Sequence, residues 1–286
     1  MLSLASVLLL GIVSPGSLTP LVTPLPGIER MHISAPTKIH VTIEPEKISA
    51  TGALLIDARS GTEVFQKNAD ARLPMASLTK IMTALLILER HAMTDVVTIP
   101  GISEQIRGST VGLMSGQHMA IGNLLRALLI PSANDAAYAL ATYDGPGVGA
   151  FVQRMNERAQ SLGLRNTHFA NPAGLDHPEQ YASARDLGWL TMAALKDERF
   201  ASIVRTRNIR ISSQEGQRYD LRNTNEMLHY NEDVFGVKTG TTDNAGECLI
   251  ILFHEQDHPY LLVLLGSKDR YTDGLHILEA VHKASK

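Results

Sequence analysis

Several features that mark common protein classes are scarce or missing in this sequence of 286 residues. Cysteine occurs once, at Cys248, which excludes an internal disulfide framework and predicts a small buried apolar residue. The net charge is −3 and the pI is about 6.4, so no positive face is available for nucleic acid or for an anionic membrane surface. The histidines include no HExxH motif or comparable helix-spaced pair, so we expect no metal site and no zinc peptidase, and Asp176 and His177 are expected to be turn and surface residues.

Long hydrophobic runs are also lacking. The apolar segment 2–13 is too short to span a bilayer as a helix but is typical of the core of a signal peptide. Prolines concentrate in the first 45 residues, which indicates a stiff extended linker. We therefore predict a signal or anchor segment with a proline-rich linker over residues 1–48 and a globular domain over 49–286. The protein is expected to be exported to the periplasmic or other extracytoplasmic face of the cell wall, with its leader cleaved or retained as an N-terminal membrane tether.

The periodicity of the apolar residues changes twice along the globular part. Residues 53–57 and 63–66 alternate as a β-hairpin does, and residues 77–196 have a mostly helical period. The β pattern returns in "FGVKTGTT", "GECLIILFHE" and "HPYLLVLLGS", before an amphipathic helix over residues 271–282. The sequence thus predicts an α/β fold of the α+β kind, in which both ends of the chain build one antiparallel sheet and a helical lobe is inserted between them.

A serine and a lysine begin the most apolar of the predicted helices, "PMASLTKIMTALLILER". Ser77 and Lys80 are three residues apart, so their side chains share one helix face, close enough for the amine to take the hydroxyl proton. Too many apolar residues follow for a single stripe, so we expect the helix to be buried nearly all round and Lys80 to need a partner. A lysine can act as a base at neutral pH only if burial or a second cation lowers its pKa.

Two later segments carry further polar groups in unusual settings. "LLIPSANDAAYALA" places Ser132 and Asn134 at a break between two apolar helices, where they can project into a cleft. "VFGVKTGTT" places Lys238, Thr239 and Gly240 on a strand, with the glycine where a ligand backbone could approach closely. Ser-x-x-Lys, Ser-x-Asn and Lys-Thr-Gly in this order are the signature of penicillin-recognising serine acyl enzymes.

Together with "NPAGLD", "SARDL" and "AGECLI", these motifs make the sequence resemble the low-molecular-mass D-alanyl-D-alanine carboxypeptidases, the serine D,D-peptidases that trim bacterial peptidoglycan. The resemblance covers roughly residues 49–284. It implies a β-lactamase/D,D-peptidase-like fold, with a central antiparallel sheet flanked by helices and the helical lobe across the active-site cleft. It also implies peptidoglycan stem peptides as substrates, β-lactam antibiotics as covalent inhibitors and no cofactor.

The resemblance further implies catalytic roles. Ser77 would attack the carbonyl between two D-alanines, with Lys80 as general base and its pKa lowered by burial and by Lys238. Ser132 could pass the proton to the departing amine. The backbone N–H groups of Ser77 and Thr241 would form the oxyanion hole.

The same resemblance implies binding roles. Asn134 would hydrogen-bond the backbone of the donor stem peptide. Lys238 and Thr239 would bind the terminal carboxylate by charge-assisted contacts, and Gly240 would let the substrate approach. A serine carboxypeptidase that removes the terminal D-alanine through a Ser77 acyl-enzyme is the expected function.

Three alternatives stay open. A D,D-endopeptidase that cuts cross-links uses the same motifs. Many carboxypeptidases of this kind continue into a second β-rich domain, whereas this chain ends soon after its last predicted strand and helix. We take this ending as support for the endopeptidase and for any membrane attachment being at the N-terminus. A class A β-lactamase is less expected, because its middle motif carries Asp where Ala133 stands, and segment 164–176 lacks the glutamate that would activate water. A non-catalytic wall-binding protein is disfavoured because every reactive group is present.

Overall fold

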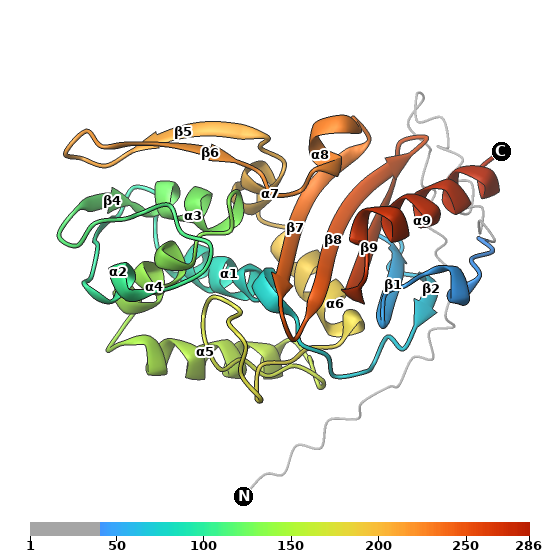
Figure 1. Ribbon diagram of the computed structural model, residues 1–286, viewed down its shortest axis with the longest axis horizontal. Coiled ribbons are helices and arrows are strands. Elements are labelled where there is room, and N and C mark those ends of the chain that lie inside the picture. The colour runs from blue at the N-terminus through green and yellow to red at the C-terminus, as the bar shows by residue number, and fades with distance from the viewer. Residues whose placement is uncertain (1–40) are drawn as a thin grey trace, which may run out of the picture. The chain divides into compact units, whose positions relative to one another are not determined.

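The computed structural model describes residues 41–286 (Figure 1). The segment for which we predicted a leader and a membrane tether lies almost entirely outside the described residues, so both remain predictions. In the part of the chain that the structure describes, no helix is long and apolar enough to cross a membrane. Val41 and Ile48, which flank a short 3-10 helix η1 (Pro45–Lys47), are buried in the core.

The centre of the molecule is the predicted antiparallel sheet, with strand order β2-β1-β9-β8-β7 (Figure 1). The first two strands come from the beginning of the domain and the other three from its end, as the periodicity predicted. Its strands are β1 (Gly52–Asp57), β2 (Glu63–Lys67), β7 (Val234–Thr242), β8 (Gly246–Glu255) and β9 (His258–Ser267). Strand β7 is therefore an edge strand, and no strand in the described part of the chain pairs with its outer side.

Alternate residues of the sheet face two separate apolar cores. Leu261 and Val263 of β9 point toward the helical lobe, whereas Leu262 and Leu264 pack under the C-terminal helix. That helix, α9 (Arg270–Ala284), lies across one face of the sheet, and α6 (Ala184–Ala194) covers the other (Figure 1). Because both faces are buried, β8 and β9 read as nearly continuous apolar runs in the sequence.

The helical lobe lies beside the edge strand β7 (Figure 1). At its centre, α1 is buried along one unbroken stretch from Lys80 to Leu88, as its all-round apolar sequence predicted. The helices of this lobe are α1 (Lys80–Arg90), α2 (Ile102–Gln105), α3 (Ile121–Leu129), α4 (Asn134–Tyr143) and α5 (Val148–Ser161). The 3-10 turn η2 (Ala76–Thr79) leads directly into α1 and lies against β7.

Some elements of the structure were not predicted. They are β3 (Val96–Thr98), β4 (His118–Ala120), α7 (Glu198–Val204), β5 (Asn208–Ser212), β6 (Arg218–Arg222) and α8 (Met227–Tyr230). The hairpin β5–β6 alternates exposed polar with more buried apolar residues, a strand pattern that is present in the sequence but covers only five residues in each strand. The strands β3 and β4 are three residues each, which is too short for a periodicity to show.

Candidate active site

The predicted Ser–Lys pair is in contact. Ser77 lies in η2, half-buried, and Lys80 opens α1 with no exposed surface. The Lys80 Nζ lies 2.8 Å from Ser77 Oγ, 2.7 Å from Asn134 Oδ1 and 2.6 Å from the Ala173 carbonyl oxygen. The partners of the buried lysine are therefore a hydroxyl and two carbonyl oxygens, and no carboxylate of residues 41–286 forms a hydrogen bond with it.

The surroundings of Lys80 favour its neutral form. Burial lowers the pKa of this amine well below its ordinary value, and the nearby charge of Lys238 lowers it further. Asp135 acts in the opposite direction but does not reverse the shift. A neutral amine can accept a proton at neutral pH, which a lysine in water cannot.

The Ala173 carbonyl is held in place by the side chain of Asn171. Asn171 Oδ1 accepts hydrogen bonds from the backbone N–H groups of Ala173, Gly174 and Leu175, at 3.2, 2.8 and 3.0 Å. Gly174 has a φ of +86°, and its Cα packs so close to η2 that a Cβ there would overlap the Ala76 carbonyl oxygen. The segment "NPAGLD" thus supplies one of the partners of Lys80, a role that we did not predict from the sequence.

Ser132 and Asn134 lie at the break between α3 and α4, as the pattern predicted. Ser132 has a φ of +67°, a conformation that a non-glycine residue adopts at some cost, and its Oγ is buried without a hydrogen-bond partner among the described residues. The Asn134 amide accepts from Lys80 and donates from Nδ2 to the Arg107 carbonyl at 2.8 Å. Asn134 therefore orients the lysine amine, and the further role that we expected for it, binding the substrate backbone, stays a prediction.

The Lys-Thr-Gly segment runs along β7 beside η2. Lys238 is 1% exposed, and its Nζ donates to the Thr239 carbonyl at 2.8 Å. Burial lowers the pKa of Lys238 to about 7, with a further contribution from the charge of Arg270. A Cβ on Gly240 would lie 2.8 Å from the Ser77 backbone nitrogen, so only glycine lets β7 approach Ser77 this closely.

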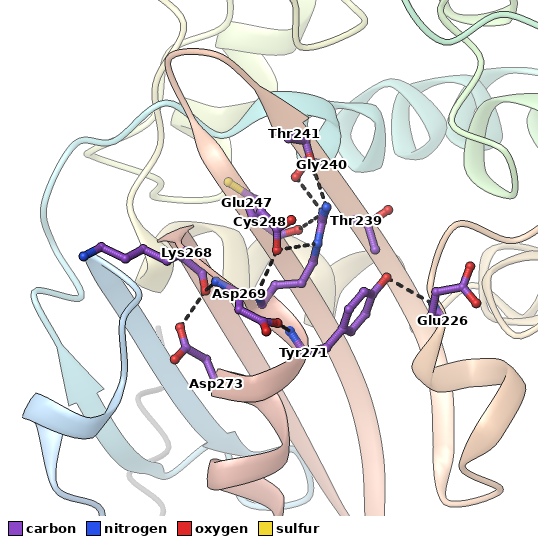
Figure 2. Close-up of polar contacts among 12 residues, drawn as sticks. Glu226, Thr239, Gly240, Thr241, Glu247, Cys248, Lys268, Asp269, Tyr271 and Asp273 are labelled. Carbon is purple, nitrogen blue, oxygen red and sulfur yellow. Dashed lines mark hydrogen bonds and ion pairs between the residues drawn. The ribbon is translucent and has the colours of Figure 1, made fainter.

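Arg270, at the start of α9, binds this part of β7 and was missed by the sequence analysis. Its guanidinium donates to the Gly240 carbonyl at 2.9 Å, to the Cys248 carbonyl at 3.1 Å and to Thr241 Oγ1 at 2.7 Å. Figure 2 labels these three acceptor residues. Its Nε lies 3.3 Å from Glu247 Oε2, within ion-pair distance but without a hydrogen bond. The guanidinium thus fixes the end of β7 next to Ser77 and adds positive charge there.

Comparisons with known proteins agree with this geometry. The family model described as D-alanyl-D-alanine carboxypeptidase matches residues 39–269. The chain belongs to this family. Among curated relatives, D-alanyl-D-alanine carboxypeptidase DacF of Bacillus subtilis is 36% identical over 205 residues, which cover 70% of this chain and 53% of DacF. A D-alanyl-D-alanine endopeptidase of Pseudomonas aeruginosa is 32% identical over 244 residues, which cover 84% of this chain and 78% of that protein.

The fold of this D-alanyl-D-alanine carboxypeptidase family member also matches solved structures. The crystal structure of a DD-transpeptidase of Streptomyces superposes with a TM-score of 0.78 at 30% identity, covering 82% of this chain and 98% of that one. The predicted α+β fold of the D,D-peptidase kind is therefore confirmed. The chain spans about half the length of DacF and 63% of the length of DacC of Escherichia coli.

Beside the reactive residues of this family member, Asp135 holds a loop in place. Its carboxylate is 1% exposed and accepts from the backbone N–H groups of Gly112 at 2.9 Å and Leu113 at 3.0 Å, with a third contact to Val111. This loop also carries the Arg107 carbonyl that receives the Asn134 amide. Asp135 therefore supports Lys80 indirectly, through Asn134.

Replacing Asp135 by asparagine is expected to lower the free energy of unfolding by about 1–3 kcal/mol, because backbone donors that now contact a carboxylate would face an amide NH₂. Thermal unfolding measures the effect. The control is Asp220→Asn, which breaks an exposed ion pair with Arg210 and should cost less than about 1 kcal/mol. Equal losses in the two variants would contradict the role given to Asp135.

The remaining groups of interest show no reactive setting. Cys248 is buried as predicted, and burial raises the pKa of its thiol to about 11, which keeps it protonated. Over residues 41–286 no group of three or more His, Cys, Asp or Glu side chains is arranged to hold a metal ion. Asp176 and His177 are exposed at the rim of a pocket beside η2.

Proposed function

We propose that this protein is a serine-type D-alanyl-D-alanine carboxypeptidase, which removes the terminal D-alanine of peptidoglycan stem peptides through an acyl-enzyme on Ser77. The observation that carries the proposal is the fully buried Lys80 amine, 2.8 Å from Ser77 Oγ. Burial and a neighbouring cation make the charged form of this amine costly, so it is available as a base where the nucleophile is.

The hydrogen bonds of Lys80 also orient its lone pair. A neutral amine has two N–H donors and one lone pair, and the Asn134 and Ala173 oxygens can only accept. Once both N–H groups are engaged there, the lone pair is left for the hydroxyl of Ser77. The Ser77 oxygen then attacks the carbonyl carbon of the scissile bond as its proton passes to Lys80.

The negative charge that develops on the substrate oxygen needs N–H donors. We assign this role to the backbone N–H groups of Ser77 and Thr241, as the sequence suggested. The close packing of Gly240 on the Ser77 nitrogen supports it, because it brings the two segments together. The contact of Arg270 with Thr241 supports it too, because a fixed strand end costs no reorganisation during the reaction.

The departing amine needs a proton, which Ser132 is proposed to pass on from Lys80. The unpartnered and buried Ser132 Oγ supports this role, since it is free to bond a group that arrives with the substrate. The terminal D-alanine leaves as a free amino acid. Water then hydrolyses the acyl-enzyme, with Lys80 as base again, and restores Ser77.

The free carboxylate of the substrate is proposed to bind Lys238 and Thr239. Lys238 is a buried amine whose one hydrogen-bond partner among residues 41–286 is a backbone oxygen, and Thr239 Oγ1 shares a hydrogen bond of 2.6 Å with Thr224. Arg270 adds a second positive charge near this end of the site. A carboxylate entering here would gain charge-assisted hydrogen bonds and restore the charged form of Lys238.

A second candidate activity is the D,D-endopeptidase reaction on peptidoglycan cross-links. It is favoured by the Pseudomonas aeruginosa relative, of whose length this chain covers 78%. We also propose β-lactam antibiotics as covalent inhibitors of Ser77, and export to the cell-wall face of the membrane as the setting of either activity.

Two assays run side by side test the proposal. Labelled penicillin should bind covalently to a peptide containing Ser77, and uncross-linked pentapeptide should release free D-alanine, detected by mass spectrometry. Monomers released from purified cross-linked dimers would report the endopeptidase activity independently. Absence of both covalent label and D-alanine release would overturn the acyl-enzyme proposal.

Lys238→Ala is expected to raise KM for a free-acid pentapeptide about tenfold or more, because a charge-assisted contact to the carboxylate is lost. Amidating the substrate C-terminus should cost the native protein a similar factor. The pKa of Lys238 is about 7, so the amine loses its charge as pH rises above neutrality, and binding of the free-acid substrate should weaken. The KM for the amidated substrate should not rise in the same way. Steady-state kinetics across pH measure both effects, and a native enzyme indifferent to amidation would show that the role is misassigned.

A further inference from the structure

A pocket of about 370 Å³ opens beside the nucleophile and takes no part in the chemistry described so far. Its floor includes Ala76, the residue before Ser77, and Gly174 of the loop that holds the Ala173 carbonyl. Its rim carries polar and charged side chains from three separate segments, namely Arg72, Asp176, His177, Tyr181 and Asn244.

The direction of β7 relates this pocket to the substrate. Along the strand, Lys238 and Thr239 precede Thr241, and the turn with Asn244 follows. On the proposed function, on which this inference rests, the carboxylate lies at Lys238 and the scissile carbonyl near Thr241. A stem peptide extended along this edge advances about 3.3 Å per residue, so the residue before D-alanyl-D-alanine arrives beside the turn that borders the pocket.

The pocket holds two charged groups without an ion-pair partner among the described residues. Arg72 donates to Asn166 Oδ1 at 3.2 Å and to the Arg165 carbonyl at 3.5 Å, while its guanidinium lies 5.2 Å from the centre of the Tyr181 ring. These contacts hold the side chain in place without neutralising it.

The carboxylate of Asp176 likewise has no ion-pair partner in the part of the chain that the structure describes. It accepts one long hydrogen bond, 3.4 Å from the Asn244 backbone nitrogen. Next to it, His177 Nδ1 accepts a hydrogen bond from the Glu179 N–H at 3.1 Å. The neutral ring therefore carries its proton on Nε2, which takes no part in that hydrogen bond. One cation and one anion thus line the same pocket without forming an ion pair with each other.

We propose that this pocket recognises a side chain ending in an amino-acid zwitterion, an ammonium and a carboxylate on one carbon, on the residue that precedes D-alanyl-D-alanine in the stem peptide. Arg72 binds the carboxylate and Asp176 the ammonium. A lysine side chain, which ends in an ammonium alone, satisfies Asp176 and leaves Arg72 unpaired. The pocket therefore discriminates between the two common forms of stem peptide.

The size of the preference follows from the exposure of the two groups. Both Arg72 and Asp176 remain accessible to solvent, so each contact is screened and is worth about a fivefold change in affinity. The preference should appear in KM more than in kcat, because the contacts are remote from the reacting atoms and are made equally in the ground and transition states.

The test compares two capped tripeptides ending in D-alanyl-D-alanine, one with meso-diaminopimelate and one with L-lysine before it. We expect the native protein to show a KM about fivefold lower for the first, and Arg72→Leu to abolish this difference by raising KM for the first alone. Asp176→Asn should raise KM for both. The matched controls are Arg165→Leu and Asp243→Asn, exposed neighbours whose side chains do not line the pocket and which change the net charge equally.

Two results would overturn the proposal: equal KM values for the two peptides on the native protein, or an Arg72→Leu variant that loses the same factor on both. Failure of the proposed function itself looks different, because neither peptide would be cut and labelled penicillin would not bind. In that case calorimetric titration of both peptides into the Ser77→Ala protein still measures the preference, and equal affinities there would also count against it.

Discussion

Replacing Lys80 by methionine is expected to slow acylation of Ser77 by about 10²–10⁴-fold, the range that a general base contributes. The methionine fills a similar volume but cannot accept the hydroxyl proton. Lys80→Arg should be as slow, because a guanidinium keeps its proton at any accessible pH. The pair of variants separates two roles: if Lys80 acted only as a positive charge, the arginine variant would retain activity.

The rate of covalent labelling by penicillin measures this effect directly, without a requirement for turnover. Lys268→Met is the matched control, since Lys268 is exposed and lies outside the cleft, and it should label at the native rate. In the native protein the labelling rate should rise with pH as Lys80 loses its proton and level off far below the ordinary lysine pKa of 10.5, because burial lowers the pKa of this amine. Labelling of Lys80→Met within tenfold of native would contradict the assignment of the base.

Replacing Gly174 by alanine is expected to lower the free energy of unfolding by about 2–4 kcal/mol and to slow acylation as well. The position has a φ of +86°, and the added methyl group would overlap the Ala76 carbonyl. Either η2 shifts, which moves Ser77, or the loop shifts, which withdraws the Ala173 carbonyl from Lys80.

Gly216→Ala is the control that separates the two causes. Gly216 has a φ of +89°, nearly the same as Gly174, but no heavy atom lies within 4 Å of an added Cβ. It should therefore show the backbone cost alone, about 1 kcal/mol, with native acylation. Thermal unfolding and penicillin labelling of the two variants make the comparison, and equal behaviour would show that the contact between Gly174 and η2 does not matter.

The sequence by itself determined the central sheet and the buried helix α1, because burial of both sheet faces and of α1 leaves nearly continuous apolar runs, bounded by polar turns, that can be read locally. It also singled out Ser77, Lys80, Asn134 and Lys238, since short motifs keep their spacing within one helix, one helix break and one strand. The hairpin β5–β6 also carries a polar/apolar alternation, but over only five residues in each strand, and the sequence analysis did not pick it out.

Only the tertiary structure decided what surrounds the reactive amine. The partner from the loop is the carbonyl of Ala173, and a backbone oxygen leaves no trace in the identity of its residue. Arg270 and Asp176 are separated from Ser77 by long stretches of chain, so their placement depends on how α9 and the loop after α5 pack. The pKa of a buried lysine depends on desolvation and on charges brought near by folding. The motif can therefore identify Lys80 as the candidate base, but its lowered pKa results from the fold.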